Sequence, residues 1–229
     1  MLDHSYNKGF EYTHKNPYHE RLANFSDFVL RDEEAEEFQG KWNSELFKRE
    51  APLVVEIGSG YGQFMREYCQ DFPEHNYVGM DYRFKRSFEL AKKLKNLNLD
   101  HMKYLRAKGE RLGFLFGENE IDSLLYFFPD PWPKARHKKK RLFQSHYLPI
   151  VHKALKPGGK MFIKTDHDDY ANHMQEVIDG SDLFDVELAT KDLRSDYKDH
   201  FLCQYTTKFE KIFIKQNQPI KAFVLTKKI

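Results

Sequence analysis

One stretch of the sequence, from Ile121 to Arg141, joins an acidic residue between two prolines to a dense run of cations. It reads IDSLLYFFPDPWPKARHKKKR. Pro129 and Pro131 fix their own φ angles and disfavour helical conformations in the residues before them, so the carboxylate of Asp130 has little freedom. A fixed carboxylate can stabilise positive charge that develops in a reacting group. Asp130 is therefore the first candidate for a catalytic residue.

The cations follow directly after this turn. Between Lys134 and Arg141 every residue except Ala135 and His137 is Lys or Arg, which is enough positive charge to hold phosphates. A structural interpretation competes with this one, because charge runs are commonly solvated faces and an Asp beside proline is commonly a turn. The combination at the end of an apolar strand favours a functional site, since strand-end loops bind ligands in open α/β sheets.

A second candidate site lies in the segment LVVEIGSGYGQFMREY, which begins at Leu53. Residues 53–57 predict a buried strand and the residues from Gln63 onward a helix. Gly58, Gly60 and Gly62 between them allow a tight turn and a close approach of the backbone to a ligand. Their spacing differs from the G-x-G-x-x-G of pyrophosphate-binding loops. Glu56 would repel a pyrophosphate but attract the cationic amino acid end of S-adenosyl-L-methionine.

Two further aspartates follow predicted strands. Asp81 ends the strand at residues 77–80, about one βαβ unit after the glycines, where an acidic residue can accept hydrogen bonds from both ribose hydroxyls. Asp166 follows the strand at residues 160–164. Because that strand is expected beside the strand at residues 121–128, Asp130 and Asp166 are predicted to meet at one edge of the sheet.

The alternation of strands and helices predicts an α/β fold, with a central, mostly parallel sheet and helices on both faces. Residues 84–97, 142–155 and 168–178 are predicted helices, and residues 101–105, 184–188 and 220–226 are predicted strands. The 229 residues suffice for one sizeable core. We expect a flexible segment and helical extension over residues 1–50, in which the acidic cluster Asp32 to Glu37 is a solvated face, and a main domain over residues 51–229.

Composition narrows the cellular setting. The net charge is only +2, so any affinity for nucleic acid must come from local patches. Cys69 and Cys203 form neither a metal-binding pattern nor a disulfide framework. No apolar run approaches the length of a membrane span, and the first residues lack a signal peptide's apolar core. We therefore expect a cytoplasmic protein that binds neither membrane nor metal.

The spacing of Thr207 and Glu210 fits a helix start, and it is equally compatible with a substrate contact.

Four sequence blocks resemble the bacterial tRNA (guanine-N7)-methyltransferases of the TrmB type. They are EIGSGYG from Glu56, FFPDPWPKARH from Phe127, KTD from Lys164 and TKFE from Thr207. The resemblance runs from about Pro17 to Thr226, and the Phe-Pro-Asp-Pro-Trp block is its most specific part. It implies a Rossmann-like class I methyltransferase fold over residues 51–229, with S-adenosyl-L-methionine as cofactor. The implied reaction is methyl transfer to N7 of a guanine in the tRNA variable loop, position 46, which forms 7-methylguanosine.

The resemblance also implies roles for individual residues. Asp130 is implied as the catalytic residue. The implied cofactor contacts are Glu56, Gly58, Gly60, Asp81 and Asp130; the substrate contacts are Lys134, Asp166, Thr207, Lys208, Phe209 and Glu210; and the RNA contacts are Arg136, His137, Lys138, Lys139, Lys140 and Arg141. One position departs from the family, because Lys108 stands where an acidic residue near the adenine is common. Adenine recognition is then expected from the backbone or from Glu110.

Three other functions compete with this one. A small-molecule methyltransferase would share Glu56, the glycines and Asp81 but would gain little from the cationic run. A non-catalytic RNA-binding protein would need no cofactor site. A dehydrogenase is disfavoured by the glycine spacing and by Glu56. The expected partner is tRNA, and the expected assembly is a monomer or a homodimer.

Overall fold

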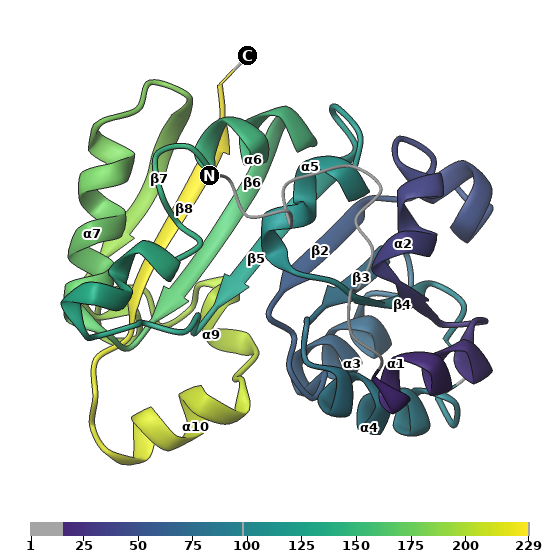
Figure 1. Cartoon of the computed structure of the whole chain (residues 1–229). Coiled ribbons are helices and arrows are strands. Elements are labelled where there is room, and N and C mark those ends of the chain that lie inside the picture. Colours follow the sequence, from purple (N-terminus) through teal and green to yellow (C-terminus); the bar gives the residue numbers. More distant parts are fainter. Residues whose placement is uncertain (1–15, 98, 229) are drawn as a thin grey trace.

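The computed structural model describes residues 16–97 and 99–228. Its centre is an eight-stranded sheet of order β1-β4-β3-β2-β5-β6-β8-β7 (Figure 1). The strands are β1 (Val29–Arg31), β2 (Leu53–Ile57), β3 (Asn76–Met80), β4 (Met102–Arg106), β5 (Ile121–Phe127), β6 (Leu155–Thr165), β7 (Phe184–Thr190) and β8 (Lys221–Lys227). In this sheet order, each strand from β1 through to β6 is parallel to the next one. β8 is antiparallel to both of its neighbours, β6 and β7. The predicted mostly parallel sheet is confirmed.

Helices cover both faces of this sheet, with α1, α3 and α4 gathered on one side and α10 projecting below the strand ends (Figure 1). The helices are α1 (Pro17–Leu22), η2 (Ala23–Phe25), α2 (Asp32–Ala35), η3 (Glu36–Phe38), η4 (Trp42–Phe47), α3 (Gln63–Asp71), α4 (Phe84–Leu94), η5 (Gly109–Arg111), α5 (Leu112–Leu115), η6 (Ala135–Lys140), α6 (Leu148–Ala154), α7 (Asp168–Asp179), α8 (Leu193–Asp196), α9 (Phe201–Gln204) and α10 (Lys208–Lys215). None of the helices in the described residues has both the length and the apolar character that crossing a bilayer requires.

The central strands separate two hydrophobic cores. All five residues of β2 are buried, as expected for a strand covered on both faces. Successive side chains point to opposite faces, so Val55 packs with α5, α6 and α7 while Val54 packs with α3 and α4. This alternation directs the side chain of Glu56 to the same face as Val54.

The residues before β2 are joined to the sheet. β1 pairs with β4 in the register Val29 to Tyr104, and Tyr18 of α1 contacts Phe88 of α4 with ring centroids 5.6 Å apart. The flexible segment was predicted at the start of the chain, and residues 1–15 lie outside the described residues. The division of the chain near residue 50 stays a prediction.

Two sequence-based expectations are wrong. The acidic cluster is not a uniformly solvated face, because Asp32 is fully buried and accepts a hydrogen bond from Arg111 Nε at 3.0 Å. The helix predicted over residues 142–155 begins only at Leu148, where Pro149 occupies the first turn. Proline is favoured there because the first N–H groups of a helix have no partner within the helix.

Candidate active site and nucleic-acid surface

The ends of β5 and β6 lie side by side. The two strands pair in parallel, with Phe127 opposite Lys164. The segments that follow β5 and β6 therefore leave the sheet at the same edge. The segment carrying Asp130 follows β5, and Asp166 follows β6. Ligands of open α/β sheets bind outside this edge.

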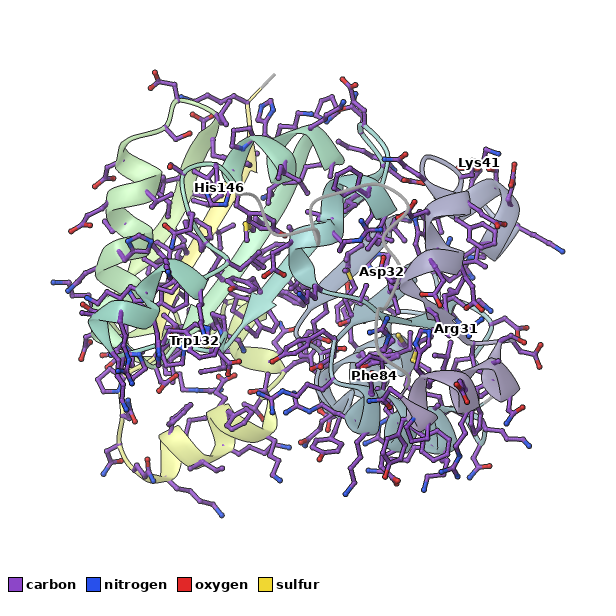
Figure 2. All side chains as sticks on the ribbon, in the orientation of Figure 1. Arg31, Asp32, Lys41, Phe84, Trp132 and His146 are labelled. Atoms are coloured by element: carbon purple, nitrogen blue, oxygen red, sulfur yellow. The ribbon has the colours of Figure 1, made fainter. Side chains whose placement is uncertain are left out.

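The turn from Phe128 to Trp132 holds strained backbone at both ends. Phe128 has φ of 49° and Trp132 has φ of 43°, in the left-handed region that bulky residues rarely adopt. Each such residue costs about 1–3 kcal/mol and persists only where its surroundings impose it. One constraint is the N–H of Phe128, which donates to the carbonyl of Lys164 at 2.7 Å. Figure 2 shows Trp132 in the region where β5 and β6 end.

The carboxylate of Asp130 is exposed and lies beside the end of β3. Its side chain is 60% exposed, and Oδ2 is 3.8 Å from the guanidinium of Arg83. The backbone N–H of Arg83 donates to Asp81 Oδ1 at 2.9 Å. Arg83 thus lies between the predicted catalytic carboxylate of Asp130 and the predicted ribose-binding carboxylate of Asp81.

Asp81 is buried but keeps unused acceptor capacity. Its side chain is 4% exposed and forms an ion pair with Arg86 at 2.9 Å, in addition to the hydrogen bond from Arg83. A carboxylate offers about four lone-pair sites. Arg83 occupies one lone pair of Oδ1 and Arg86 one lone pair of Oδ2, so each oxygen can still accept a hydrogen bond from a hydroxyl.

The glycine turn lies next to Asp81 and has a defined shape. Gly58, Gly60 and Gly62 have φ of 82°, 61° and 63°. The N–H of Gly58 donates to the carbonyl of Met80, the residue before Asp81, at 2.8 Å. A Cβ at Gly62 would lie 2.9 Å from Leu90, whereas one at Gly58 would meet nothing within 4 Å. Gly62 is therefore required for packing, and the backbone at Gly58 is open to a ligand.

Glu56 is a buried carboxyl group at the end of β2. It is 3% exposed and accepts a hydrogen bond from the hydroxyl of Tyr77 at 2.7 Å. Burial raises its pKa to about 7, although the Tyr77 hydroxyl and the positive charge of Lys164 act in the opposite direction. Near neutral pH the protonated and ionised forms of Glu56 are therefore similarly populated, which is unusual for a glutamate.

The Thr207–Glu210 block divides into structural and exposed residues. Thr207 Oγ1 accepts from the backbone N–H of Glu210 at 3.1 Å, which confirms the predicted helix start at α10. The side chain of Glu210 is fully buried and contacts Lys164 Nζ at 2.5 Å and Arg194 at 2.7 Å. Lys208 is exposed, and Phe209 is 55% exposed.

Lys164 is a buried cation whose role the sequence does not predict. Its side chain is 0% exposed. Besides binding Glu210, its ammonium donates to the carbonyls of Leu202 at 3.1 Å and Tyr205 at 3.2 Å. These contacts use all three donors and fasten α9 and the start of α10 to β6. The signal in the sequence is a lysine that directly follows the apolar residues 161–163 near the end of β6.

Most cations of the basic run remain at the surface. Lys134, Arg136, Lys139 and Lys140 are exposed. Lys140 Nζ lies 4.8 Å from the centre of the Trp132 ring, and the ring of His137 meets the same indole edge-on at 5.8 Å. Lys138 is bound to Asp169 at 2.6 Å. We call the exposed cations Lys134, Arg136, Lys139 and Lys140 the η6 surface, and Lys140 is the one that contacts Trp132.

Arg141 differs from the rest of the run. Its side chain is 1% exposed, and its Nε donates to the carbonyl of Pro131 at 2.8 Å. The guanidinium also binds Asp169 and stacks over the Tyr170 ring at 4.7 Å. Hydrogen bonds from Lys138 and Arg141 lower the pKa of Asp169 to about 2. Arg141 is therefore a buried residue that contacts the turn carrying Asp130 through the carbonyl of Pro131.

Asp166 and Lys108 are the remaining positions singled out by the sequence. Asp166 is half-buried, and its carbonyl accepts from Lys221 Nζ at 3.0 Å, while its carboxylate has no hydrogen bond or ion pair among the described residues. Lys108 precedes η5, the short helix that contains Glu110.

The chain is similar to known methyltransferases. Residues 50–223 match a family described as "Putative methyltransferase". The tRNA (guanine-N(7)-)-methyltransferase of Enterococcus faecalis is 34% identical over 191 residues, which cover 83% of this chain and 87% of the relative. The namesake from Clostridium tetani is 33% identical and covers 78% of this chain and 84% of the relative. A bifunctional glycosyltransferase/methyltransferase of Fusobacterium nucleatum is 31% identical over 96% of this chain, which spans only 34% of that relative.

Solved structures share the architecture at low identity. The 16S rRNA methyltransferase KamB has a TM-score of 0.58 and 13% identity, covering 81% of this chain and 92% of its own. An rRNA methylase from Streptococcus thermophilus has a TM-score of 0.52 and 14% identity, covering 95% of this chain and 100% of its own. These likenesses establish the methyltransferase fold. The sequence matches establish the family, and the chain belongs to the tRNA (guanine-N7)-methyltransferases.

Proposed function

We propose that this protein transfers the methyl group of S-adenosyl-L-methionine to N7 of a guanine in the variable loop of tRNA, at position 46. The observation that carries the proposal is the strained turn of Phe128–Trp132. It presents the exposed Asp130 carboxylate between the end of β3 and the η6 surface. The names of the relatives support the same reaction.

The residues at the sheet edge fit the cofactor by their chemistry. Asp81 has acceptor capacity for ribose hydroxyls, Gly58 offers open backbone, and Glu56 can ionise to meet an ammonium group. When bound, S-adenosyl-L-methionine supplies an electrophilic methyl group on a sulfonium. Asp81, Gly58 and Glu56 bind and orient it at the edge where Asp130 lies.

Methylation of guanine N7 requires no general base from the protein. N7 of guanine has an in-plane lone pair and no proton to remove, so alignment matters more than a strong base. The purine gains positive charge as the new bond forms. We assign Asp130 to stabilise that charge and to accept hydrogen bonds from the N–H edge of guanine. The free carboxylate of Asp166 is assigned to the base or its ribose.

Affinity for tRNA is assigned to local charge, because the whole chain carries only +2. The exposed cations of the η6 surface suit phosphate contacts, and Trp132 offers a ring face for a base. We expect a monomer or homodimer in the cytoplasm, where the tRNA is.

The direct test incubates the protein with labelled S-adenosyl-L-methionine and unmodified tRNA, followed by borohydride and aniline cleavage. One cleavage site in the variable loop is expected. Label on small acceptors but not on tRNA would favour a small-molecule methyltransferase instead.

The role of Asp130 is tested by Asp130→Ala. Turnover should be abolished while the Kd for tRNA stays close to the wild-type value, because the substitution removes charge stabilisation and not a phosphate contact. Equal activity of the two proteins would refute the assignment.

A further inference from the structure

A second cationic surface lies apart from the basic run. It surrounds a hollow of about 280 Å³ between the glycine turn, α3, α4 and α10. The hollow is lined by Tyr61, Gln63, Arg66, Lys93 and Lys208. Residues that are distant in the sequence therefore meet here, and we call this feature the α3–α10 hollow.

Within the described part of the chain, the cations that line the hollow are not held in salt bridges, although Glu89 on α4 interacts electrostatically with Lys93. Arg66, Lys93 and Lys208 form none of the ion pairs found among residues 16–97 and 99–228. Their neighbour Lys92 is paired, with Glu89 at 2.8 Å. Cations around one concave surface repel one another and attract anions. The Nε of Arg66 donates to the carbonyl of Gly62 at 3.1 Å, which orients its guanidinium.

An exposed aromatic ring borders these cations. Tyr61 is 51% exposed, with Lys93 Nζ 5.8 Å and the Arg86 guanidinium 5.4 Å from its ring centre. Cations that follow a phosphate backbone, next to a ring on which a base can stack, are the usual elements of single-stranded nucleic-acid binding. An isolated inorganic anion would gain nothing from the ring.

The hollow and the basic run flank the Asp130 turn. α3 and α4 follow β2 and β3, whereas η6 follows β5. The Lys138–Asp169 ion pair joins η6 to α7, which follows β6, so the η6 surface lies towards β6, whereas the α3 and α4 walls of the hollow lie towards β2 and β3. We propose that the α3–α10 hollow binds a phosphodiester of the tRNA, so that the RNA is held on both sides of the reacting guanine. This inference rests on the proposed function.

Charge reversal tests the proposal. The Kd for unmodified tRNA is measured over a series of salt concentrations for Arg66→Glu, Lys208→Glu and the double variant. The double variant should bind at least about tenfold more weakly, and its plot of log K against log salt should be shallower by about 0.7–0.9 for each phosphate that the protein no longer neutralises. Lys95→Glu at the end of α4 and Lys211→Glu on α10 are controls, because both residues are exposed and lie outside the hollow. Each should change the Kd much less.

Other measurements separate the possible failures. Lys93→Glu is a second variant that leaves the hydrogen bond from Arg66 to Gly62 intact, and an unchanged thermal midpoint verifies folding. Wild-type protein that methylates tRNA, alongside a double variant with wild-type Kd and salt slope, would overturn the hollow and leave the proposed function intact. Wild-type protein that binds tRNA without methylating it would overturn the function alone. Weaker binding of S-adenosyl-L-methionine with unchanged tRNA binding would assign the hollow to the cofactor, against the proposal.

Discussion

Replacing Arg141 by methionine should slow catalysis without weakening tRNA binding. The side chain is 1% exposed, and its charged group donates at 2.8 Å to the carbonyl of Pro131, next to Asp130. A hydrogen bond to a charged group contributes about 1.5–3 kcal/mol. The turn it stabilises contains two residues with left-handed backbone, which relax when a constraint is removed.

The magnitude follows from these contacts. A loss of about 2–3 kcal/mol in the positioning of Asp130 corresponds to a fall in kcat of about 30- to 150-fold, since about 1.4 kcal/mol is a factor of ten. Arg141→Lys should recover part of this rate, because an ammonium keeps the charge but cannot reproduce the forked geometry. Asp169→Asn should give a smaller loss of kcat, because it weakens the contact of Arg141 with residue 169 and keeps the hydrogen bond from Arg141 to Pro131.

The assay measures kcat at saturating tRNA together with the Kd for tRNA at several salt concentrations. Lys139→Met is the matched control: it removes one positive charge from the same run at an exposed position. It should raise the Kd and flatten the salt dependence by about 0.7–0.9 while leaving kcat near the wild-type value. If Arg141→Met instead behaved like Lys139→Met, Arg141 would be an RNA contact and the positioning role would be refuted.

Two further predictions concern the buried carboxyl groups. Because the pKa of Glu56 is about 7 and an ammonium group favours the ionised form, the Kd for S-adenosyl-L-methionine should fall by up to about fivefold between about pH 6 and pH 7. Calorimetry on Glu56→Gln should show a flat profile over that range, and a flat wild-type profile would contradict the assignment. Lys164→Met leaves Glu210 buried beside Arg194 alone and should destabilise the fold by about 3–5 kcal/mol. The thermal midpoint should then fall by roughly 6–20 °C, and a fall of under about 3 °C would show that α10 is held by other contacts.

The main elements of the fold, and the edge at which ligands are expected, could be predicted from the amino-acid order alone. Residues 53–57 form the strand β2 where their apolar run predicts it. Asp130 and Asp166 follow neighbouring strands, and the glycine turn precedes α3. These features were predictable because burial of consecutive residues, proline geometry and glycine φ angles are local properties of the chain.

Which charged side chains are available to a ligand depends instead on how the chain folds back on itself. Arg141, Glu210 and Asp32 belong to polar runs in the sequence, yet they are buried against partners 28, 46 and 79 residues away. The α3–α10 hollow likewise exists only because the fold brings Lys208, at the start of α10, to the same hollow as Gln63 and Arg66 of α3. A charged residue has the same local pattern whether it faces solvent or a buried partner. The distinction arises from long-range packing, which sets the desolvation and the pairing of each charge.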